Sequence, residues 1–93
     1  MRLSSQERHS IVTAVRSLDP DAGILLFGSR ADDSKKGGDI DLLILSHRIG
    51  SAEKRHIRRK ICDAIGDQRI DIVAVSDDSD PLVRLARRTG VPL

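Results

Sequence analysis

The chain has 93 residues, a formal net charge of +2 and 39% hydrophobic residues, which allows one small domain, expected over residues 1–93. Phe27 is the only aromatic residue, so the composition argues against a protein that stacks nucleic-acid bases on aromatic side chains. The single cysteine, Cys62, excludes an internal disulfide and is typical of a reducing compartment. No apolar run approaches a membrane span of roughly 20 residues, and none follows the N-terminal charges as in a secretory signal, so we expect a cytoplasmic protein.

The first segment of the chain predicts a capped helix followed by a buried strand. Ser4 and Glu7 have the spacing of a capping box, and apolar residues recur behind them at helical intervals, so we predict a helix over 4–18. The Asp-Pro-Asp sequence at 19–21 is expected to end it. Gly23 then leads into the apolar run ILLF, which suits a buried strand.

A polar loop and a second strand come next. Gly28-Ser29 ends the first strand, and the polar stretch 31–38, which closes on two glycines, predicts a loop. The apolar part of DIDLLIL (39–45) is continuous, as expected of a strand covered on both faces. The loop is too short for a crossover helix, so we expect these two strands to pair antiparallel.

A basic amphipathic helix is predicted after the second strand. Ser51 is expected to cap it, its isoleucines share one face over 51–65, and Gly66 ends it. Lys and Arg residues between 54 and 60 cover the rest of the helix. Such a run is more often a solvated face than a nucleic-acid patch, so a nucleic-acid partner is not expected.

The last segment predicts a third strand and a short helix. RIDIVAV (69–75) is apolar and is joined to the second strand through a helix, so the two strands are expected to be parallel. Asp80-Pro81 opens the last helix, and Gly90 ends it. The sequence therefore predicts an α/β (α+β) fold, in which helices flank a small mixed sheet.

Three aspartates stand at the heads of the second and third predicted strands. Asp39 and Asp41 are two residues apart, so both side chains point to one face. Two carboxylates about 4 Å apart repel by roughly 4 kcal/mol at an effective dielectric of about 20, which favours a cation between them. Asp71 holds the same place on the third strand, and parallel neighbouring strands would bring all three acids to one end of the sheet. Each acid alone is more simply a solvated strand-end residue, but together they are the oxygen donors that one or two Mg²⁺ ions use beside substrate phosphates.

The turn after the first strand could bind phosphate. Gly28 lets the backbone approach a ligand closely, and the Ser29 hydroxyl with free N–H groups would form an anion site if a helical turn starts there. Arg30 could add a charge-assisted contact. A Gly-Ser pair alone is usually only a turn, and its meaning comes from its distance to the carboxylates.

The segment LFGSRADDSKKGGDIDLLIL resembles the core motif of the polymerase-β-like nucleotidyltransferase superfamily, in which a strand, Gly-Ser and a loop precede Asp-x-Asp. QRIDIVAV is similar to the later strand that carries the third carboxylate. The closing DPLVRLARRTGVPL resembles the ends of minimal nucleotidyltransferase (MNT) domains. The resemblance covers nearly the whole chain. It implies the nucleotidyltransferase fold and Mg²⁺-dependent transfer of a nucleoside monophosphate, expected to be AMP from ATP, to a hydroxyl group.

The resemblance also implies roles for particular residues. Gly28 and Ser29 would hold the phosphates, and the catalytic, metal-binding carboxylates would be Asp39, Asp41 and Asp71. Asp71 would also help to deprotonate the acceptor hydroxyl.

The chain departs from the family pattern directly after the Gly-Ser turn. Many MNT domains read Gly-Ser-Arg-Ala-Arg-Gly, whereas Ala31 is followed here by Asp32-Asp33. A second arginine is thereby replaced at the mouth of the predicted site. Asp32 and Asp33 are expected to cap a turn rather than to bind metal.

The resemblance implies a protein partner as well. Small MNT domains are commonly paired with a helical HEPN-domain protein as the antitoxin of a toxin–antitoxin pair, so a HEPN-like partner is expected to supply the acceptor, unless self-association completes the site. Two alternatives remain at this point. The protein could neutralise its partner by covering it without catalysis, or it could modify a small molecule such as an aminoglycoside.

Overall fold

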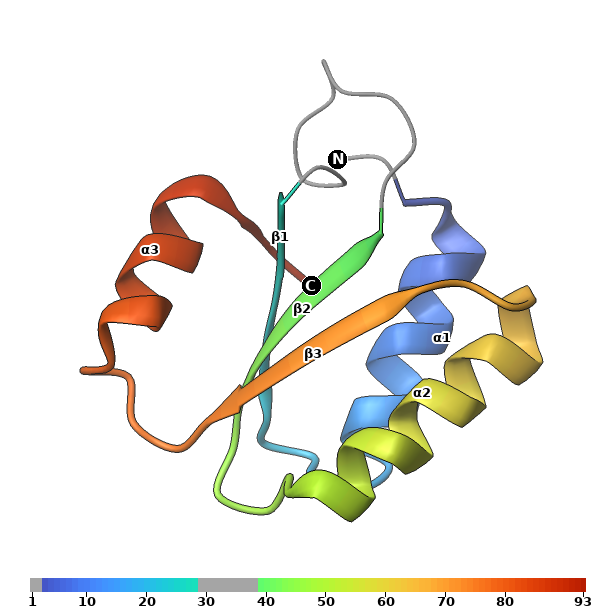
Figure 1. The fold of residues 1–93 in the computed structure, drawn as a ribbon, viewed down its shortest axis with the longest axis horizontal. Coiled ribbons are helices and arrows are strands. Elements are labelled where there is room, and N and C mark those ends of the chain that lie inside the picture. The colour runs from blue at the N-terminus through green and yellow to red at the C-terminus, as the bar shows by residue number, and fades with distance from the viewer. Residues whose placement is uncertain (1–2, 29–38) are drawn as a thin grey trace.

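The computed structural model describes residues 3–28 and 39–93 and is shown in Figure 1. The elements, in chain order, are α1 (Ser5–Arg16), β1 (Gly23–Phe27), β2 (Ile40–Leu45), α2 (Ser51–Ile65), β3 (Ile70–Val75), α3 (Pro81–Thr89) and β4 (Val91–Pro92). All six predicted helices and strands are present in this order, and β4 is added to them. Within the described ranges, no helix is both long and apolar enough to cross a membrane.

The strands form one mixed sheet in the order β3-β2-β1-β4. β1 and β2 are antiparallel, and β2 and β3 are parallel, so both predicted pairings are confirmed. β4 pairs antiparallel with β1 and is extended by a bond from the Leu93 N–H to the Ile24 carbonyl, 2.9 Å long. The sequence did not predict β4, because two residues including Pro92 carry no strand periodicity of their own.

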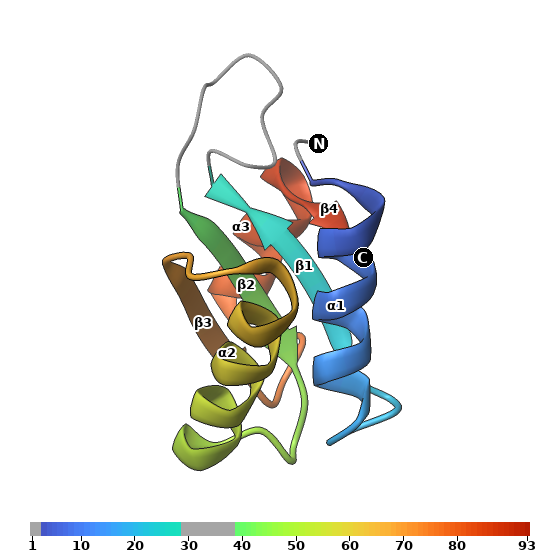
Figure 2. The same ribbon diagram turned by 90° about the vertical axis from the view of Figure 1, so that its right-hand side faces the viewer.

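Helices cover the sheet on both faces, as predicted. Figure 2 shows α1 and α2 in front of the sheet and α3 behind it. Successive residues of β2 divide between the two layers: Ile40 and Leu42 join the core beneath α1 and α2, whereas Leu43 joins the cluster beneath α3. The continuous apolar run of β2 follows from this coverage on both faces.

The capping box predicted for the first helix is present. The Ser4 hydroxyl accepts from the Glu7 N–H at 3.0 Å, and the Glu7 carboxylate accepts from the Ser4 N–H at 2.9 Å. The helix ends at Arg16, two residues earlier than predicted. The N–H of Leu18 donates to the Val15 carbonyl, only three residues back, so the chain has already tightened into a turn.

The prediction for the start of α2 was wrong by one residue. Gly50, not Ser51, is the N-cap, and Ser51 is the first helical residue. The Glu53 carboxylate accepts from the Gly50 N–H at 2.8 Å and so satisfies the helix start in place of a serine hydroxyl. Gly66 ends the helix as predicted, since its N–H closes the last turn on the Cys62 carbonyl.

Candidate active site

Asp41 and Asp71 occupy equivalent places on neighbouring parallel strands. Each is the second residue of its strand, β2 and β3, and the two are direct partners in the register. Their side chains lie on the face covered by α3, because Leu43 and Val73, two residues further along, belong to the cluster beneath that helix. The expectation that the heads of these two strands meet at one end of the sheet is therefore confirmed.

Asp39 lies just before β2, and its carboxylate forms an ion pair with Arg69. Its Oδ2 atom is 3.4 Å from Nε of Arg69, and the two side chains are 45% and 77% exposed. The sequence analysis did not include Arg69 among the site residues. The alternation of side chains along a strand could have indicated it, because Arg69 stands two residues before Asp71 and therefore on the same face. Among residues 3–28 and 39–93, no three acidic, histidine or cysteine side chains gather closely enough to hold a metal by themselves.

Asp41 carries a negative charge that its surroundings do not fully compensate. Burial raises the pKa of its carboxyl group above the ordinary value, and the charges of Asp71 and Asp39 raise it further, together with a hydrogen bond to Asp71. Arg69 acts in the opposite direction and does not cancel the shift. A cation bound between Asp41 and Asp71 would remove this repulsion, since an opposite charge within about 4–6 Å favours the ionised form.

Gly28, which directly follows β1, lies against the Asp41 carboxylate. It follows Phe27, which is the register partner of Asp41 on the antiparallel side of β2. Its φ of +75° is the left-handed conformation that glycine adopts readily, and a Cβ atom at this place would collide with the Asp41 carboxylate. Glycine is thus required here by the backbone and by the approach of Asp41.

The rest of the predicted phosphate site lies outside the described residues. Ser29 and Arg30, and with them Asp32 and Asp33, fall in the segment 29–38, of which the structure gives no description. Of the predicted turn, Gly28 alone is placed, at the head of β2 beside Asp41.

The donor set formed by Asp41 and Asp71 fits a divalent cation such as Mg²⁺. Carboxylate oxygens are the hard ligands that this ion prefers, and proteins commonly hold it with only one or two carboxylates, leaving the other positions to water and substrate phosphates. Asp71 is exposed, and Asp41 is half-buried. The pair is therefore suited to an open site that a polyphosphate completes.

Apolar side chains border the carboxylates on the same face of the sheet. Phe27 and Val73 line a cavity of about 80 Å³ with Leu82 and Leu85 of α3. The two leucines are 49% and 56% exposed. An apolar surface thus adjoins the acidic pair on the side toward α3.

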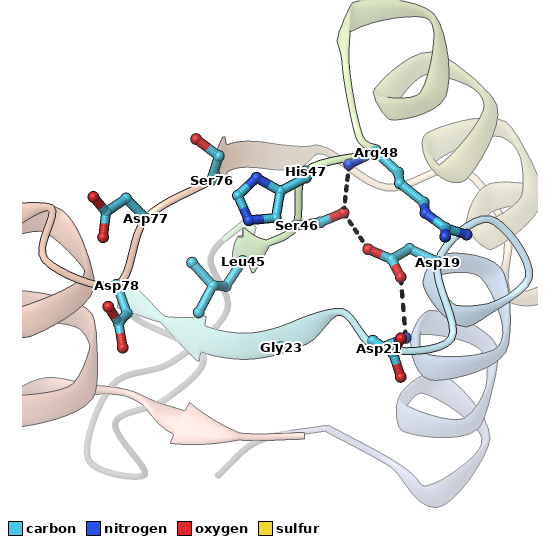
Figure 3. A pocket seen from close by; sticks show the side chains of 10 residues that line it. All are labelled: Asp19, Asp21, Gly23, Leu45, Ser46, His47, Arg48, Ser76, Asp77 and Asp78. Carbon is cyan, nitrogen blue, oxygen red and sulfur yellow. Dashed lines mark hydrogen bonds between the residues drawn. The ribbon is translucent and has the colours of Figure 1, made fainter.

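A wider cavity of about 940 Å³ lies at the opposite end of the sheet, and Figure 3 shows its lining. Acidic groups line it too, but its buried carboxylate is fully engaged. The Ser46 hydroxyl donates to the Asp19 carboxylate, which also accepts from the Asp21 N–H at 3.0 Å. The bond from Ser46 lowers the pKa of Asp19, so its charge is stabilised by the protein itself. At this end of the sheet, hydrogen bonds from the protein stabilise the negative charge of Asp19. At the other end, burial and neighbouring acids disfavour the negative charge of Asp41. We therefore place the candidate active site at Asp41.

Two comparisons with known proteins bear on this site. The sequence model of a family described as a nucleotidyltransferase domain matches residues 9–87, a range that runs from within α1 to within α3. The match includes Gly28 and all three carboxylates. A search of curated proteins finds no match to the chain.

Proposed function

We propose that this chain, which belongs to the nucleotidyltransferase domain family, transfers a nucleoside monophosphate from a nucleoside triphosphate to a hydroxyl group in an Mg²⁺-dependent reaction. The observation that carries the proposal is the direct pairing of Asp41 with Asp71, together with the raised pKa of Asp41. Two ionisable acids held side by side cost stability in a small domain, and they are useful when a cation and a polyphosphate bind there.

In the reaction, the oxygen of the acceptor hydroxyl forms a bond to the α-phosphorus, and the bond to the β-phosphate oxygen breaks, releasing pyrophosphate. Asp41 and Asp71 would hold Mg²⁺, which supplies positive charge to the triphosphate when bound. Asp71 is exposed and can therefore be reached by an acceptor. We assign to its carboxylate the acceptance of the hydroxyl proton, which makes the oxygen a better nucleophile.

We also include Asp39 in the metal-binding set. Its present partner, Arg69, is 77% exposed, and the two atoms are 3.4 Å apart. Such an exposed ion pair is worth only about 0–1 kcal/mol, so a divalent cation can replace it. Arg69 then becomes available for a substrate phosphate at the same edge of the site.

The turn after β1 is proposed to bind the phosphates. The left-handed Gly28 allows the chain to leave β1 directly beside Asp41. The next two residues, Ser29 and Arg30, would offer a hydroxyl and a guanidinium group to the polyphosphate. Phosphates bound there would lie next to the proposed cation, as metal-assisted phosphoryl chemistry requires.

We propose ATP as the donor and a partner protein as the acceptor, namely a helical HEPN-domain toxin, with this chain acting in the cytoplasm as its antitoxin. The exposed Leu82 and Leu85 support a protein acceptor, because they form an apolar surface beside the carboxylates. The same leucines favour a second candidate, neutralisation of the toxin by binding alone. Modification of a small molecule is the less favoured acceptor class, since the cavity that described residues form beside the carboxylates has a volume of about 80 Å³.

The test is to incubate the chain with ATP, Mg²⁺ and the protein encoded beside it, and to weigh that protein intact. We expect an added mass of one AMP group, which Asp41→Asn and Asp71→Asn abolish. Asp63→Asn is the matched control, because Asp63 is an exposed acid on α2 that lies beside α1, on the face of the sheet opposite to Asp41. Absence of added mass with the unaltered chain would count against protein modification.

The binding alternative is separated by a neutralisation assay. The double variant Asp39→Asn, Asp41→Asn removes charge from the proposed metal site and leaves the leucine surface of α3 intact. If it still neutralises the toxin fully, catalysis is not the means of neutralisation.

A further inference from the structure

β3 forms one edge of the sheet, and its outer side has no neighbouring strand among the described residues. The Arg69 carbonyl accepts from the Ile40 N–H at 3.0 Å, so the odd-numbered positions direct their backbone groups toward β2. The Val75 carbonyl follows the same rule and accepts from the Ser46 N–H at 2.9 Å. Alternate residues of a strand direct these groups to opposite sides. The Ile70 carbonyl therefore points away from β2, to the side where no strand can donate to it.

A side chain of α2 supplies the donor for this carbonyl. The guanidinium Nε of Arg58 donates to the Ile70 carbonyl at 3.1 Å. This carbonyl belongs to the peptide unit that joins Ile70 to Asp71, and the N–H of the same unit is that of Asp71. No cis peptide bond occurs among the described residues, and in a trans peptide the N–H and the C=O point in opposite directions. Arg58 thus holds the unit from the outer side, while its N–H points toward β2.

A second contact from α2 holds the residues that precede the strand. Cys62 stands four residues after Arg58 and therefore on the same side of the helix, and its thiol donates to the Gln68 carbonyl at 3.6 Å. Only residues 66–69 separate α2 from β3, and Figure 1 shows this short turn from the end of the helix into the strand. One side of α2 thus fixes the chain at two points directly before Asp71.

Arg58 itself is not needed to fill the core beneath α2. Ile57 and Ile61 are the buried side chains of this helix, whereas Arg58 is exposed and only its contact with Ile70 is partly buried. The next residue, Arg59, is exposed as well, and it forms no hydrogen bond or ion pair with the described part of the chain. The two neighbouring arginines therefore carry the same charge, and only one of them contacts β3.

The peptide unit that Arg58 holds determines where the Asp71 carboxylate points. Asp71 is exposed and is the second residue of an edge strand, so a neighbouring strand supports it on one side only. A rotation of the peptide unit would turn the Cα–Cβ bond of Asp71 and change its separation from Asp41, its partner in the register. Contacts that orient a ligand are commonly as important to a metal site as the ligand itself.

We propose that Arg58 is a positioning residue of the candidate active site. Its guanidinium group holds the Ile70–Asp71 peptide unit and thereby directs the Asp71 carboxylate toward the cation that it shares with Asp41. The cation rests on the proposed function, whereas the hold on the peptide unit rests on the contact of Arg58 with Ile70 alone. Two measurements therefore test the two parts separately.

Amide hydrogen exchange tests the hold on the peptide unit without any ligand. Arg58→Met keeps an unbranched side chain and removes the donor, so we expect the Asp71 N–H to exchange about ten times faster than in the unaltered chain. The N–H of Val73, further along β3, is the internal reference and should change much less. Arg59→Met is the matched control, which removes the same charge and should alter neither rate. An unchanged rate at Asp71, or equal acceleration at Val73, would overturn the proposal.

Binding of Mn²⁺ without nucleotide tests the consequence for the carboxylates. Mn²⁺ prefers the same oxygen ligands as Mg²⁺, and the electron paramagnetic resonance signal of the free ion reports how much is bound. We expect Arg58→Met to weaken Mn²⁺ binding about tenfold. Loss of a positive charge would by itself favour the binding of a cation, as Arg59→Met should show, so a weaker affinity reports a displaced carboxylate. Arg58→Lys keeps a donor and should recover most of the affinity. Equal affinities of Arg58→Met and Arg59→Met would contradict the positioning role.

A double variant shows whether Arg58 acts through Asp71. If it does, the two losses are not additive, and Arg58→Met should weaken Mn²⁺ binding little further once Asp71→Asn is present. Full additivity would show that Arg58 acts on the site by another route and would overturn the positioning role. A failure of the unaltered chain to bind Mn²⁺ would contradict the cation site of the proposed function, and the exchange rate of the Asp71 N–H would still decide whether Arg58 holds the peptide unit.

Discussion

The two faces of the sheet differ in how completely they are buried. Beneath α1 and α2, fourteen described residues form one continuous buried cluster. Beneath α3, the buried cluster has four, and two leucines of the covering helix are about half exposed. The larger face can therefore supply most of the hydrophobic stabilisation, which is roughly proportional to the apolar area removed from water.

The carboxylates of the candidate active site lie on the less completely buried face, beneath α3. Asp41 and Asp71 project from it, and a carboxylate on the other face would be buried among isoleucines. A chain of this size can therefore hold an electrostatically costly pair of acids, because the well-packed opposite face stabilises the fold.

The largest effect on stability is expected on the buried face. Ile57 is fully buried between α2 and the sheet, so Ile57→Ala should cost about 2–5 kcal/mol of unfolding free energy. Leu82→Ala on α3, where the side chain is 49% exposed, should cost clearly less than this. Urea unfolding of both variants gives the comparison. Equal losses would mean that the two faces contribute alike.

A smaller loss is expected at the end of β1. Gly28→Ala forces a left-handed conformation on a residue with a Cβ, at roughly 1–2 kcal/mol, and adds a collision with Asp41. Gly23→Ala, at the other end of the strand, is the control, because its Cβ would meet Leu45 at an ordinary contact distance of 3.4 Å. Thermal unfolding should separate the two variants, and a Gly28→Ala protein as stable as Gly23→Ala would argue against the close approach of Asp41.

Asp19, at the far end of the sheet, should stabilise the fold through its charge. The bond from Ser46 lowers its pKa in the folded state below the ordinary value of 3.8. Its contribution is therefore present above that value and is lost as the pH falls through the lowered pKa. We expect Asp19→Asn to lower Tm by several degrees at pH 7 and by progressively less below pH 3.8. A difference in Tm that persists unchanged in acid would contradict the assignment.

The ionised carboxylate of Asp41, unlike that of Asp19, should not stabilise the fold. Its replacement is expected to change Tm least among these variants. Burial and neighbouring acids raise its pKa, so the folded chain holds the proton more tightly than the unfolded chain. Its contribution to stability is therefore present when the group is protonated and is lost as the pH rises through the raised pKa. Asp41→Asn should therefore leave Tm at pH 7 unchanged or raise it by a few degrees. A marked loss of stability would show that the carboxylate is a structural acceptor, like Asp19.

Local sequence signals predicted the parts of this fold that local chemistry decides. The capping box at Ser4 and Glu7 fixed the start of α1. The apolar runs before and after the polar loop gave β1 and β2, and the helix between β2 and β3 gave their parallel pairing. That pairing was enough to predict that Asp41 and Asp71 meet.

Features decided by tertiary contacts could not be predicted in the same way. β4 exists because the chain after α3 returns to β1, and its two residues carry no pattern that indicates a strand. The ion pair of Arg69 with Asp39 depends on the register of β3 against the residue that precedes β2. The contact of Arg58 with the edge of β3 joins a helical side chain to a backbone carbonyl twelve residues away, which no periodicity reports.

We propose that Asp41 and Asp71 form a cation site that a nucleoside triphosphate completes. Calorimetric titration with ATP, in the presence and absence of Mg²⁺, tests it most directly. We predict that the unaltered chain and Asp63→Asn bind ATP only when Mg²⁺ is present, and that Asp41→Asn and Asp71→Asn weaken this binding at least tenfold, or by about 1.4 kcal/mol. Binding of ATP that is equally strong without Mg²⁺, or that survives both substitutions, would contradict the account.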